Sequence, residues 1–210
     1  MSILNDITAA TENGKSKIIK QLVPEALEQG VAANDILDAL MVAMGTVGEK
    51  FKAGTAFVPD MLVSARAMKT GTAILKPYLV GSDVKSAGKI ILGTVAGDLH
   101  DIGKNLVGMM FEGKGFEVID LGVDVAPDFF ISTAIQEKAD IIACSSLLST
   151  TMPVMADVIK AAEDAGIRDK VAIMVGGAPV TQAFADSIGA DAYTNNAASA
   201  ADRALQLVAH

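Results

Sequence analysis

The stretch KIILGTVAGDLHDIGKNLVGMMF, residues 89–111, sets the pattern for most of this 210-residue chain. Residues 89–95 form an apolar run of strand length, and residues 105–111 have the composition of a helix opening. Between them lies a turn that contains His100, the one histidine of the chain apart from His210. In open α/β sheets, ligands bind at such turns, beyond the carboxyl ends of the strands. The stretch therefore predicts a strand, a turn with a candidate binding histidine, and a helix.

Short apolar runs alternate with helical segments along the rest of the chain after this stretch. The predicted strands are rich in β-branched residues and cover residues 89–95, 117–120, 140–144, 171–175 and, more weakly, 191–194. Five strands joined by crossover helices predict a parallel, doubly wound sheet with helices on both faces. We expect a Rossmann-like α/β domain with the flavodoxin-like order of strands.

The first 80 residues instead carry helical periods. Short helices are predicted near residues 3–11 and 15–28, and a third helix is expected to begin after Asn34 as its N-cap. Its apolar residues recur at the spacing of a core-facing stripe: Ile36, Leu37, Leu40, Met41, Met44, Val47 and Phe51. Pro59 suits the first turn of a fourth helix. Four helices with short loops predict a small N-terminal four-helix bundle.

Between the two regions, residues 81–88 have no apolar period and are framed by glycines. We interpret them as an interdomain linker. The predicted organisation is a helical domain over residues 1–80, a linker over residues 81–88, and a Rossmann-like domain over residues 89–210.

The composition fits folded domains and excludes some classes of partner. Apolar residues make up 51% of the chain, which is enough for a substantial core. Lys and Arg number 17 against 25 Asp and Glu, and the net charge of −8 lies entirely beyond residue 80. A nucleic acid or an anionic membrane surface needs clustered basic residues, so we expect neither as a partner.

Cysteine content and hydropathy predict a cytoplasmic protein. Cys144 is the only cysteine, which excludes an internal disulfide, and the N-terminus lacks the basic and apolar regions of a signal peptide. The longest uncharged stretches, residues 141–156 and 171–185, are shorter than the ~20 residues that a membrane helix needs. We therefore expect no transmembrane segment.

Three short motifs follow the predicted strands. The pattern DxHxxG, formed by Asp98, His100 and Gly103, comes after the first strand. Ser145-Ser146-Leu147 comes after the third strand and Gly176-Gly177 after the fourth. Each motif alone has an ordinary explanation as a helix cap or a strand-to-helix turn. In this order and spacing they resemble the DxHxxG, SxL and GG set of the cobalamin-binding family, which includes methionine synthase and small corrinoid proteins.

This resemblance implies a cobalamin or related corrinoid cofactor, with His100 replacing the cofactor's dimethylbenzimidazole tail as the lower axial ligand of cobalt. Asp98 would hydrogen-bond the other ring nitrogen of His100 and so set its tautomer and basicity. Thr151 aligns with a serine that extends this relay in the family, and it retains the hydroxyl while adding a methyl group. A neutral imidazole suits the role, because cobalt that cycles between Co(III) and Co(I) needs a lower ligand that binds and leaves reversibly.

The same resemblance assigns further residues around the cofactor. Gly103 would allow the large planar ring to approach the backbone. Ser145, Gly176 and Gly177 would leave room for the displaced tail. The full implied set in this domain is Asp98, His100, Asp101, Ile102, Gly103, Ser145, Leu147, Thr151, Gly176 and Gly177.

The helical domain looks like the cap that precedes the cobalamin domain in the same family. The likeness rests on residues 48–51, 57–61 and 64–68. It implies that four apolar residues lie over the upper face of the corrin and shelter its methyl ligand: Phe51, Phe57, Val58 and Met61. Methionine and phenylalanine at helical spacing are more commonly core residues, and that alternative stays open.

These resemblances imply a corrinoid carrier protein in one-carbon metabolism that is not catalytic alone. A substrate-specific methyltransferase would load a methyl group onto Co(I), and a second methyltransferase would pass it to an acceptor such as tetrahydrofolate. A reductive activation protein is a further implied partner. Methylamines, glycine betaine, methanol and methoxylated aromatics are all possible donors, because the partner's pocket would select among them.

Two alternative functions remain. A cobalamin-dependent sensor or regulator is disfavoured, because the sequence contains no recognisable DNA-binding module, no basic surface signal and no tryptophan. A cobalamin-binding subunit of a mutase would share the DxHxxG set but would not need a cap that shields a methyl group. The cap motif at residues 57–61 therefore favours the carrier.

Overall fold

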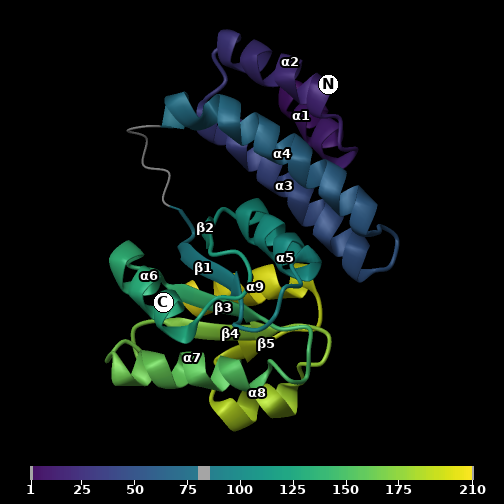
Figure 1. Ribbon diagram of the computed structural model, residues 1–210. Coiled ribbons are helices and arrows are strands. Elements are labelled where there is room, and N and C mark those ends of the chain that lie inside the picture. The colour runs from purple at the N-terminus through teal and green to yellow at the C-terminus, as the bar shows by residue number, and fades with distance from the viewer. Residues whose placement is uncertain (1, 80–85, 210) are drawn as a thin grey trace. The chain divides into compact units, whose positions relative to one another are not determined.

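The computed structural model describes residues 2–79 and 86–209, and within them the chain forms nine helices and five strands (Figure 1). The chain divides into two compact units, Met1–Lys85 and Ser86–His210, which are described separately below. Most of the predicted linker, residues 81–85, lies outside the described residues.

The first unit is helical within residues 2–79. Its helices are α1 (Ile3–Glu12), α2 (Ser16–Glu28), α3 (Ala33–Lys52) and α4 (Val58–Leu79). Helix α3 packs against α1 and α4, and α2 packs against α4 and α1. The predicted four-helix bundle is confirmed. In the part of the chain that the structure describes, no helix is both long and apolar enough to cross a membrane.

The core of this unit follows the predicted stripe of α3. Ile36, Leu40 and Met44 are buried. Helix α4 approaches this stripe closely at Gly71, where a Cβ atom would lie 2.7 Å from Cδ1 of Leu40. A larger residue at position 71 would therefore require the Leu40 side chain to move.

The expected N-cap of α3 is wrong. The helix begins at Ala33, and Ala32 occupies the N-cap position without a side-chain hydrogen bond. Asn34 lies instead inside the first turn, next to Asp35. Alanine enters a helix readily, and the carboxylate of Asp35 interacts favourably with the positive end of the helix dipole, so the helix starts earlier than the asparagine suggests.

The second unit is built on a parallel sheet with the order β2-β1-β3-β4-β5. Its strands are β1 (Lys89–Thr94), β2 (Glu117–Asp120), β3 (Ile141–Ser145), β4 (Ala172–Gly176) and β5 (Ala192–Tyr193). This is the flavodoxin-like order that was expected. All five predicted strands are present, and each strand begins and ends within one residue of its predicted position.

Helices cover both faces of the sheet (Figure 1). They are α5 (Ile102–Gly113), α6 (Pro127–Glu137), α7 (Pro153–Asp164), α8 (Gln182–Ile188) and α9 (Ala197–Val208). Helix α5 packs with α9, whereas α6 packs with α7 and α7 with α8. The core beneath α6, α7 and α8 includes Ile91, Val95, Phe130, Ile142, Val158 and Ile173. The predicted doubly wound α/β architecture is confirmed.

The last residues of the predicted linker belong to the second unit. The backbone N–H of Ala87 donates to the carbonyl of Gly115 at 3.0 Å, and the N–H of Glu117 donates to the carbonyl of Gly88 at 3.0 Å. These bonds extend the pairing of β1 with β2 toward the N-terminus. The second unit therefore begins before Lys89, where the predicted domain started.

Candidate functional site

The candidate site lies at the carboxyl edge of the sheet, where β1 and β3 are neighbours. Beyond β1 the chain crosses to one side of the sheet, and beyond β3 it crosses to the other, so this is the topological switch point where open sheets bind ligands. The loop after β1 contains Asp98 and His100, and the loop after β3 contains Ser146 and Thr151. The fold thus brings together motifs that are about 50 residues apart in the sequence, as expected for adjacent parallel strands joined by a crossover.

Asp98 joins these two loops. Its side chain is fully buried, and both of its oxygens accept hydrogen bonds. Oδ1 accepts from the backbone N–H of His100 at 3.0 Å and lies 2.8 Å from Nδ1 of the same residue. Oδ2 accepts from the N–H groups of Leu147 (2.7 Å) and Leu148 (3.2 Å) and from the hydroxyl of Thr151 (3.0 Å). One carboxylate therefore orients the histidine and fixes the loop after β3.

These contacts keep Asp98 ionised. Burial acts to raise the pKa of Asp98, because a low-dielectric interior disfavours the charged form. Hydrogen bonds from the N–H groups of His100 and Leu147, with those from the His100 ring and the Thr151 hydroxyl, outweigh burial and hold the pKa of Asp98 well below its usual range. At neutral pH the group is a carboxylate that can only accept hydrogen bonds.

The ionised carboxylate determines the tautomer of His100. Since Asp98 can only accept, Nδ1 of His100 must carry the proton in their 2.8 Å contact. In the neutral ring, Nε2 then keeps its lone pair. About half of the His100 side chain (51%) is exposed, and no hydrogen bond from the described residues reaches Nε2. Thr94 fixes the backbone of the loop by donating its hydroxyl to the carbonyl of His100 at 2.9 Å.

Two buried hydroxyl groups complete the surroundings of Asp98. Oγ of Ser146 and Oγ1 of Thr151 lie 2.8 Å apart, and each also lies within hydrogen-bond distance of the carbonyl of Leu148. The extra methyl group of Thr151 does not displace its hydroxyl from the carboxylate. Sequence reasoning missed Ser146, which is the variable position of the SxL motif. The signal available was a polar residue directly after a buried strand.

The glycines of the motifs differ in their surroundings. A Cβ atom added at Gly103 or Gly176 would meet no described atom within 4 Å, so both positions are open. At Gly177, φ is +135° and a Cβ atom would lie only 1.8 Å from the carbonyl oxygen of Ser146. The close contact between the two loops therefore requires a glycine at position 177, and its expected role beside the cofactor's tail stays a prediction.

Other predicted residues occupy exposed parts of the same edge. Leu99 (71% exposed) and Leu147 (43% exposed) lie in the two loops beside the Asp98 contact, and Ile102 (78% exposed) is the first residue of α5. Apolar side chains gathered on exposed loops are typical of binding sites. Asp101 occupies the N-cap position of α5 and accepts from Nδ2 of Asn105 at 3.1 Å. Ser145 ends β3 beside the open Gly176 of β4.

The four predicted cap residues lie in the first unit. Phe57 is 66% exposed immediately before α4, and Val58, the first residue of α4, is also exposed. The N–H of Phe57 donates to Oδ2 of Asp60 at 2.8 Å, which fixes the start of the helix. Phe51 is half-buried near the end of α3. Met61 is buried, on the same side of α4 as Ala65, Met68 and Leu75, so it packs as a core residue in this structure.

The residues at the carboxyl edge fit a corrinoid. When its ring is neutral, His100 presents Nε2 with a free lone pair, and Gly103 and Gly176 have open space where a side chain would be. No group of three or more His, Cys, Asp and Glu side chains could hold a metal ion within residues 2–79 and 86–209. A single protein nitrogen is sufficient for a cobalt ion that the corrin ring already holds through four nitrogens.

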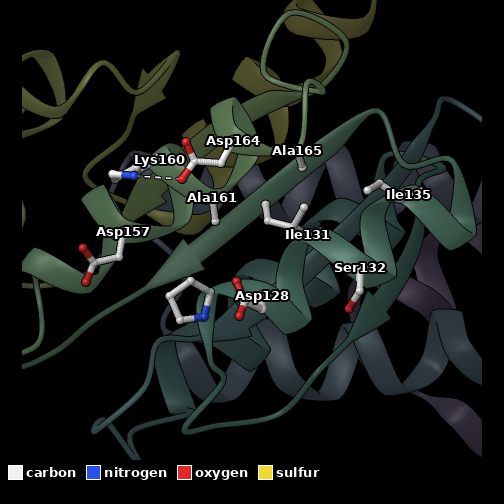
Figure 2. A pocket seen from close by; sticks show the side chains of 10 residues that line it. Asp128, Ile131, Ser132, Ile135, Asp157, Lys160, Ala161, Asp164 and Ala165 are labelled. Atoms are coloured by element: carbon white, nitrogen blue, oxygen red, sulfur yellow. Dashed lines mark hydrogen bonds and ion pairs between the residues drawn. The ribbon is translucent and has the colours of Figure 1, made fainter.

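A separate groove lies between α6 and α7 (Figure 2). Its floor is apolar at Ile131 and Ala161. Nζ of Lys160 pairs with Asp164 at 2.8 Å across one turn of α7, and this hydrogen bond raises the pKa of Lys160. None of the predicted site residues lines the groove, so it is distinct from the carboxyl edge of the sheet.

Comparison with known proteins identifies the family. Residues 88–205 match the model of a B12 binding domain, and residues 3–76 match that of a second B12 binding domain. The chain is 39% identical to a corrinoid protein of Desulfitobacterium hafniense over 212 residues, covering 99% of this chain and 98% of that protein. It is 46% identical to dimethylamine corrinoid protein 3 of Methanosarcina mazei over 167 residues, covering 79% of this chain and all (100%) of that protein.

A solved structure shares the whole fold. The crystal structure of the methanol:cobalamin methyltransferase complex MtaBC from Methanosarcina barkeri contains a chain that is 31% identical, with a TM-score of 0.90 over 99% of this chain and 80% of that one. The two domain matches, the relatives and this structure agree with the motifs at the carboxyl edge. The chain belongs to the B12-binding family of corrinoid proteins, and its cofactor is cobalamin or a related corrinoid.

Proposed function

We propose that this chain carries methyl groups on a corrinoid whose cobalt binds Nε2 of His100 as its lower axial ligand. The observation that carries the proposal is the contact between Nδ1 of His100 and the ionised Asp98, because it leaves the lone pair of Nε2 free. When bound, the corrinoid supplies a cobalt ion that can accept and release a methyl group. His100 would take the place of the cofactor's own tail base.

Asp98 and its partners would keep His100 in the state that binds a metal. Asp98 holds the proton on Nδ1 and sets the orientation of the ring, which makes Nε2 a better ligand. The hydroxyl of Thr151 and the two N–H groups of residues 147 and 148 stabilise the charge on Oδ2. We propose that Asp98 and Thr151 tune the ligand, while Ser146 supports the hydroxyl of Thr151.

The open glycines would border the cofactor. We propose that Gly103 allows the corrin ring to approach the start of α5, beside Asp101 and Ile102. Gly176 and Ser145 would leave space for the displaced tail at the ends of β4 and β3. The support for this arrangement is that both glycines have open space where a side chain would be.

The exposed apolar residues of the helical unit would shelter the methyl group. Phe57 and Val58 are exposed at the start of α4, which supports a role in covering the upper face of the cofactor together with Phe51. Met61, which is buried, would act indirectly by holding the first turn of α4 in place. Leu147 would contact the lower face beside His100.

Two methyltransferases and an activator are the proposed partners. The relatives are named for dimethylamine and for a methanol:cobalamin methyltransferase complex, so a methyltransferase for a small methylated substrate is the proposed donor-side partner. Selection among methylamines, methanol and other donors would reside in that partner's pocket. A second methyltransferase, with an acceptor such as tetrahydrofolate, and a reductive activation protein complete the proposed cycle.

Electron paramagnetic resonance of the corrinoid-loaded chain in the Co(II) state tests the ligand assignment. Nitrogen hyperfine coupling from an imidazole is expected in the unmodified chain and is expected to disappear in His100→Ala. His210→Ala is the matched control, because it removes the other histidine and should keep the coupling. Coupling that persists unchanged in His100→Ala would contradict the proposal.

A further inference from the structure

Asp124, in the loop between β2 and α6, binds the backbone on both sides of the Gly97–Asp98 peptide. Its Oδ1 accepts from the N–H of Gly97 at 2.7 Å. Its own N–H donates to the carbonyl of Asp98 at 3.0 Å. One residue, 26 positions further along the chain, therefore fixes the peptide from which the Asp98 side chain projects.

The Gly97–Asp98 peptide needs such support. Gly97 has φ of +81°. Glycine adopts this conformation readily but also populates many others, so the residue itself does little to restrain the chain. The N–H of Asp98 donates to the carbonyl of Val95 at 3.1 Å, which closes the turn. The two contacts with Asp124 restrain the groups on either side of the peptide, the N–H of Gly97 and the carbonyl of Asp98.

The loop that carries Asp124 is itself held against β1. The N–H of Leu121 donates to the carbonyl of Leu92 at 2.8 Å, and that of Val125 donates to the carbonyl of Thr94 at 3.0 Å. Val125 is buried and forms a parallel bridge with Val95. Asp124 projects from this fixed segment with φ of +55°, a left-handed conformation that aspartate and asparagine tolerate better than other residues with side chains.

We propose that Asp124 is a positioning residue of the corrinoid site, which orients the Asp98 carboxylate and, through it, the His100 imidazole. Asp124 acts at the backbone of Asp98, whereas Leu147, Leu148 and Thr151 act at its carboxylate. The inference deepens the proposed function. Only the measurement on the Co(II) form rests on that function. A residue that merely shapes its own turn would have no effect on bonds that other residues make to Asp98.

Amide hydrogen exchange in the cofactor-free chain tests this distinction. Asp124→Gly removes the accepting oxygen and fits a φ of +55°, whereas Asp124→Asn keeps an accepting oxygen and is the matched control. Faster exchange at Gly97 is expected from the lost bond itself. The informative amide is that of Leu147, which donates to Oδ2 of Asp98 and should exchange about fivefold faster in Asp124→Gly only. Unchanged exchange at Leu147 would overturn the inference.

The Co(II) spectrum of the corrinoid-loaded chain provides the second measurement. The ratio of histidine-bound to histidine-free Co(II) should fall about fivefold in Asp124→Gly and stay near that of the unmodified chain in Asp124→Asn. Absence of imidazole coupling in the unmodified chain would contradict the proposed function but not the exchange result at Leu147. Normal coupling in Asp124→Gly together with unchanged exchange at Leu147 would refute the role of Asp124 alone. Asp124→Ala removes the same oxygen and replaces the glycine variant if thermal unfolding shows that the latter is not folded.

Discussion

Replacing Asp98 with asparagine keeps the shape of the side chain but removes its charge and one of its accepting oxygens. In the unmodified chain, both oxygens of Asp98 accept hydrogen bonds from N–H groups. An asparagine side chain has one accepting oxygen and one NH₂ group that can only donate. Whichever way the amide turns, its NH₂ group must face groups that were donors.

The two orientations differ in their cost. If the NH₂ group points toward the loop after β3, it meets the fixed N–H groups of Leu147 and Leu148. If it points toward His100, it meets one fixed N–H group and Nδ1 of the ring. Nδ1 can accept once the proton moves to Nε2, so we expect this second orientation. Asp98→Asn should therefore change the tautomer of His100.

The magnitude follows from the bonds that change. The backbone N–H of His100 loses its acceptor, and the bonds from Leu147, Leu148 and Thr151 now reach a neutral oxygen. A hydrogen bond to a charged group contributes about 1.5–3 kcal/mol, so the free energy of unfolding should fall by about 3 kcal/mol at pH 7. The effect on metal binding should be larger than this figure suggests, because a protonated Nε2 has no lone pair to offer.

Nuclear magnetic resonance of chains labelled with ¹⁵N-histidine measures the tautomer directly. The chain has two histidines, and His210→Ala identifies the signals of the other. We expect protonated Nδ1 in the unmodified chain and protonated Nε2 in Asp98→Asn, with urea unfolding to measure the loss of stability. Asp101→Asn, in the same loop but exposed, is the control and should keep protonated Nδ1. Protonated Nδ1 in Asp98→Asn would refute the reasoning.

Three further expectations concern the same unit. Gly177→Ala should lower the free energy of unfolding by about 3 kcal/mol, because its Cβ would lie 1.8 Å from the carbonyl oxygen of Ser146 at a φ of +135°; an unchanged urea midpoint would show that the loops separate freely. Since the pKa of Asp98 is lower in the folded than in the unfolded chain, its stabilisation is complete above about pH 4 and is lost as the pH falls further. The difference in unfolding free energy between the unmodified chain and Asp98→Asn should accordingly narrow as urea titrations move from pH 5 to pH 3, and a constant difference would contradict this. Burial raises the pKa of Cys144 to about 12, so iodoacetamide at pH 8 should label it only after unfolding, whereas rapid labelling of the folded chain would show that the thiol is accessible.

The strands and their order could be predicted from the sequence because the core is periodic. Runs such as residues 89–95 are mostly apolar, as expected of strands covered on both faces, and the helices between them leave few topologies open. The first residues of the helices were harder to predict from the sequence. Asn34 has the right side chain for an N-cap, but the choice between it and Ala32 depends on how the preceding loop packs, which no local pattern reveals.

The candidate site could be predicted only where its residues belong to a motif. Asp98, His100 and Thr151 were expected to interact, and the structure places them within hydrogen-bond distance. Ser146 and Asp124 were missed, because their contacts depend on loop conformation and backbone groups rather than on a residue pattern. Gly177 was recognised as part of a motif, but its contact was not, since a sequence does not show that a carbonyl oxygen of another loop lies 1.8 Å from where a Cβ atom would be.

The carboxylate of Asp98 is buried, yet it orients the ring of His100, which is half exposed. Removing Asp98 from water is costly, and the cost is offset by N–H groups and a hydroxyl that point at its oxygens from two loops. Such a set of donors is available at the switch point, where the loops after β1 and β3 begin side by side and then diverge. The tautomer of His100 is therefore decided inside the protein, at Nδ1, which leaves the lone pair of the neutral ring on Nε2. Because the two nitrogens belong to one ring, the proposed ligand assignment predicts that any change that weakens the donors around Asp98 is measurable as a change in the bond between Nε2 and cobalt.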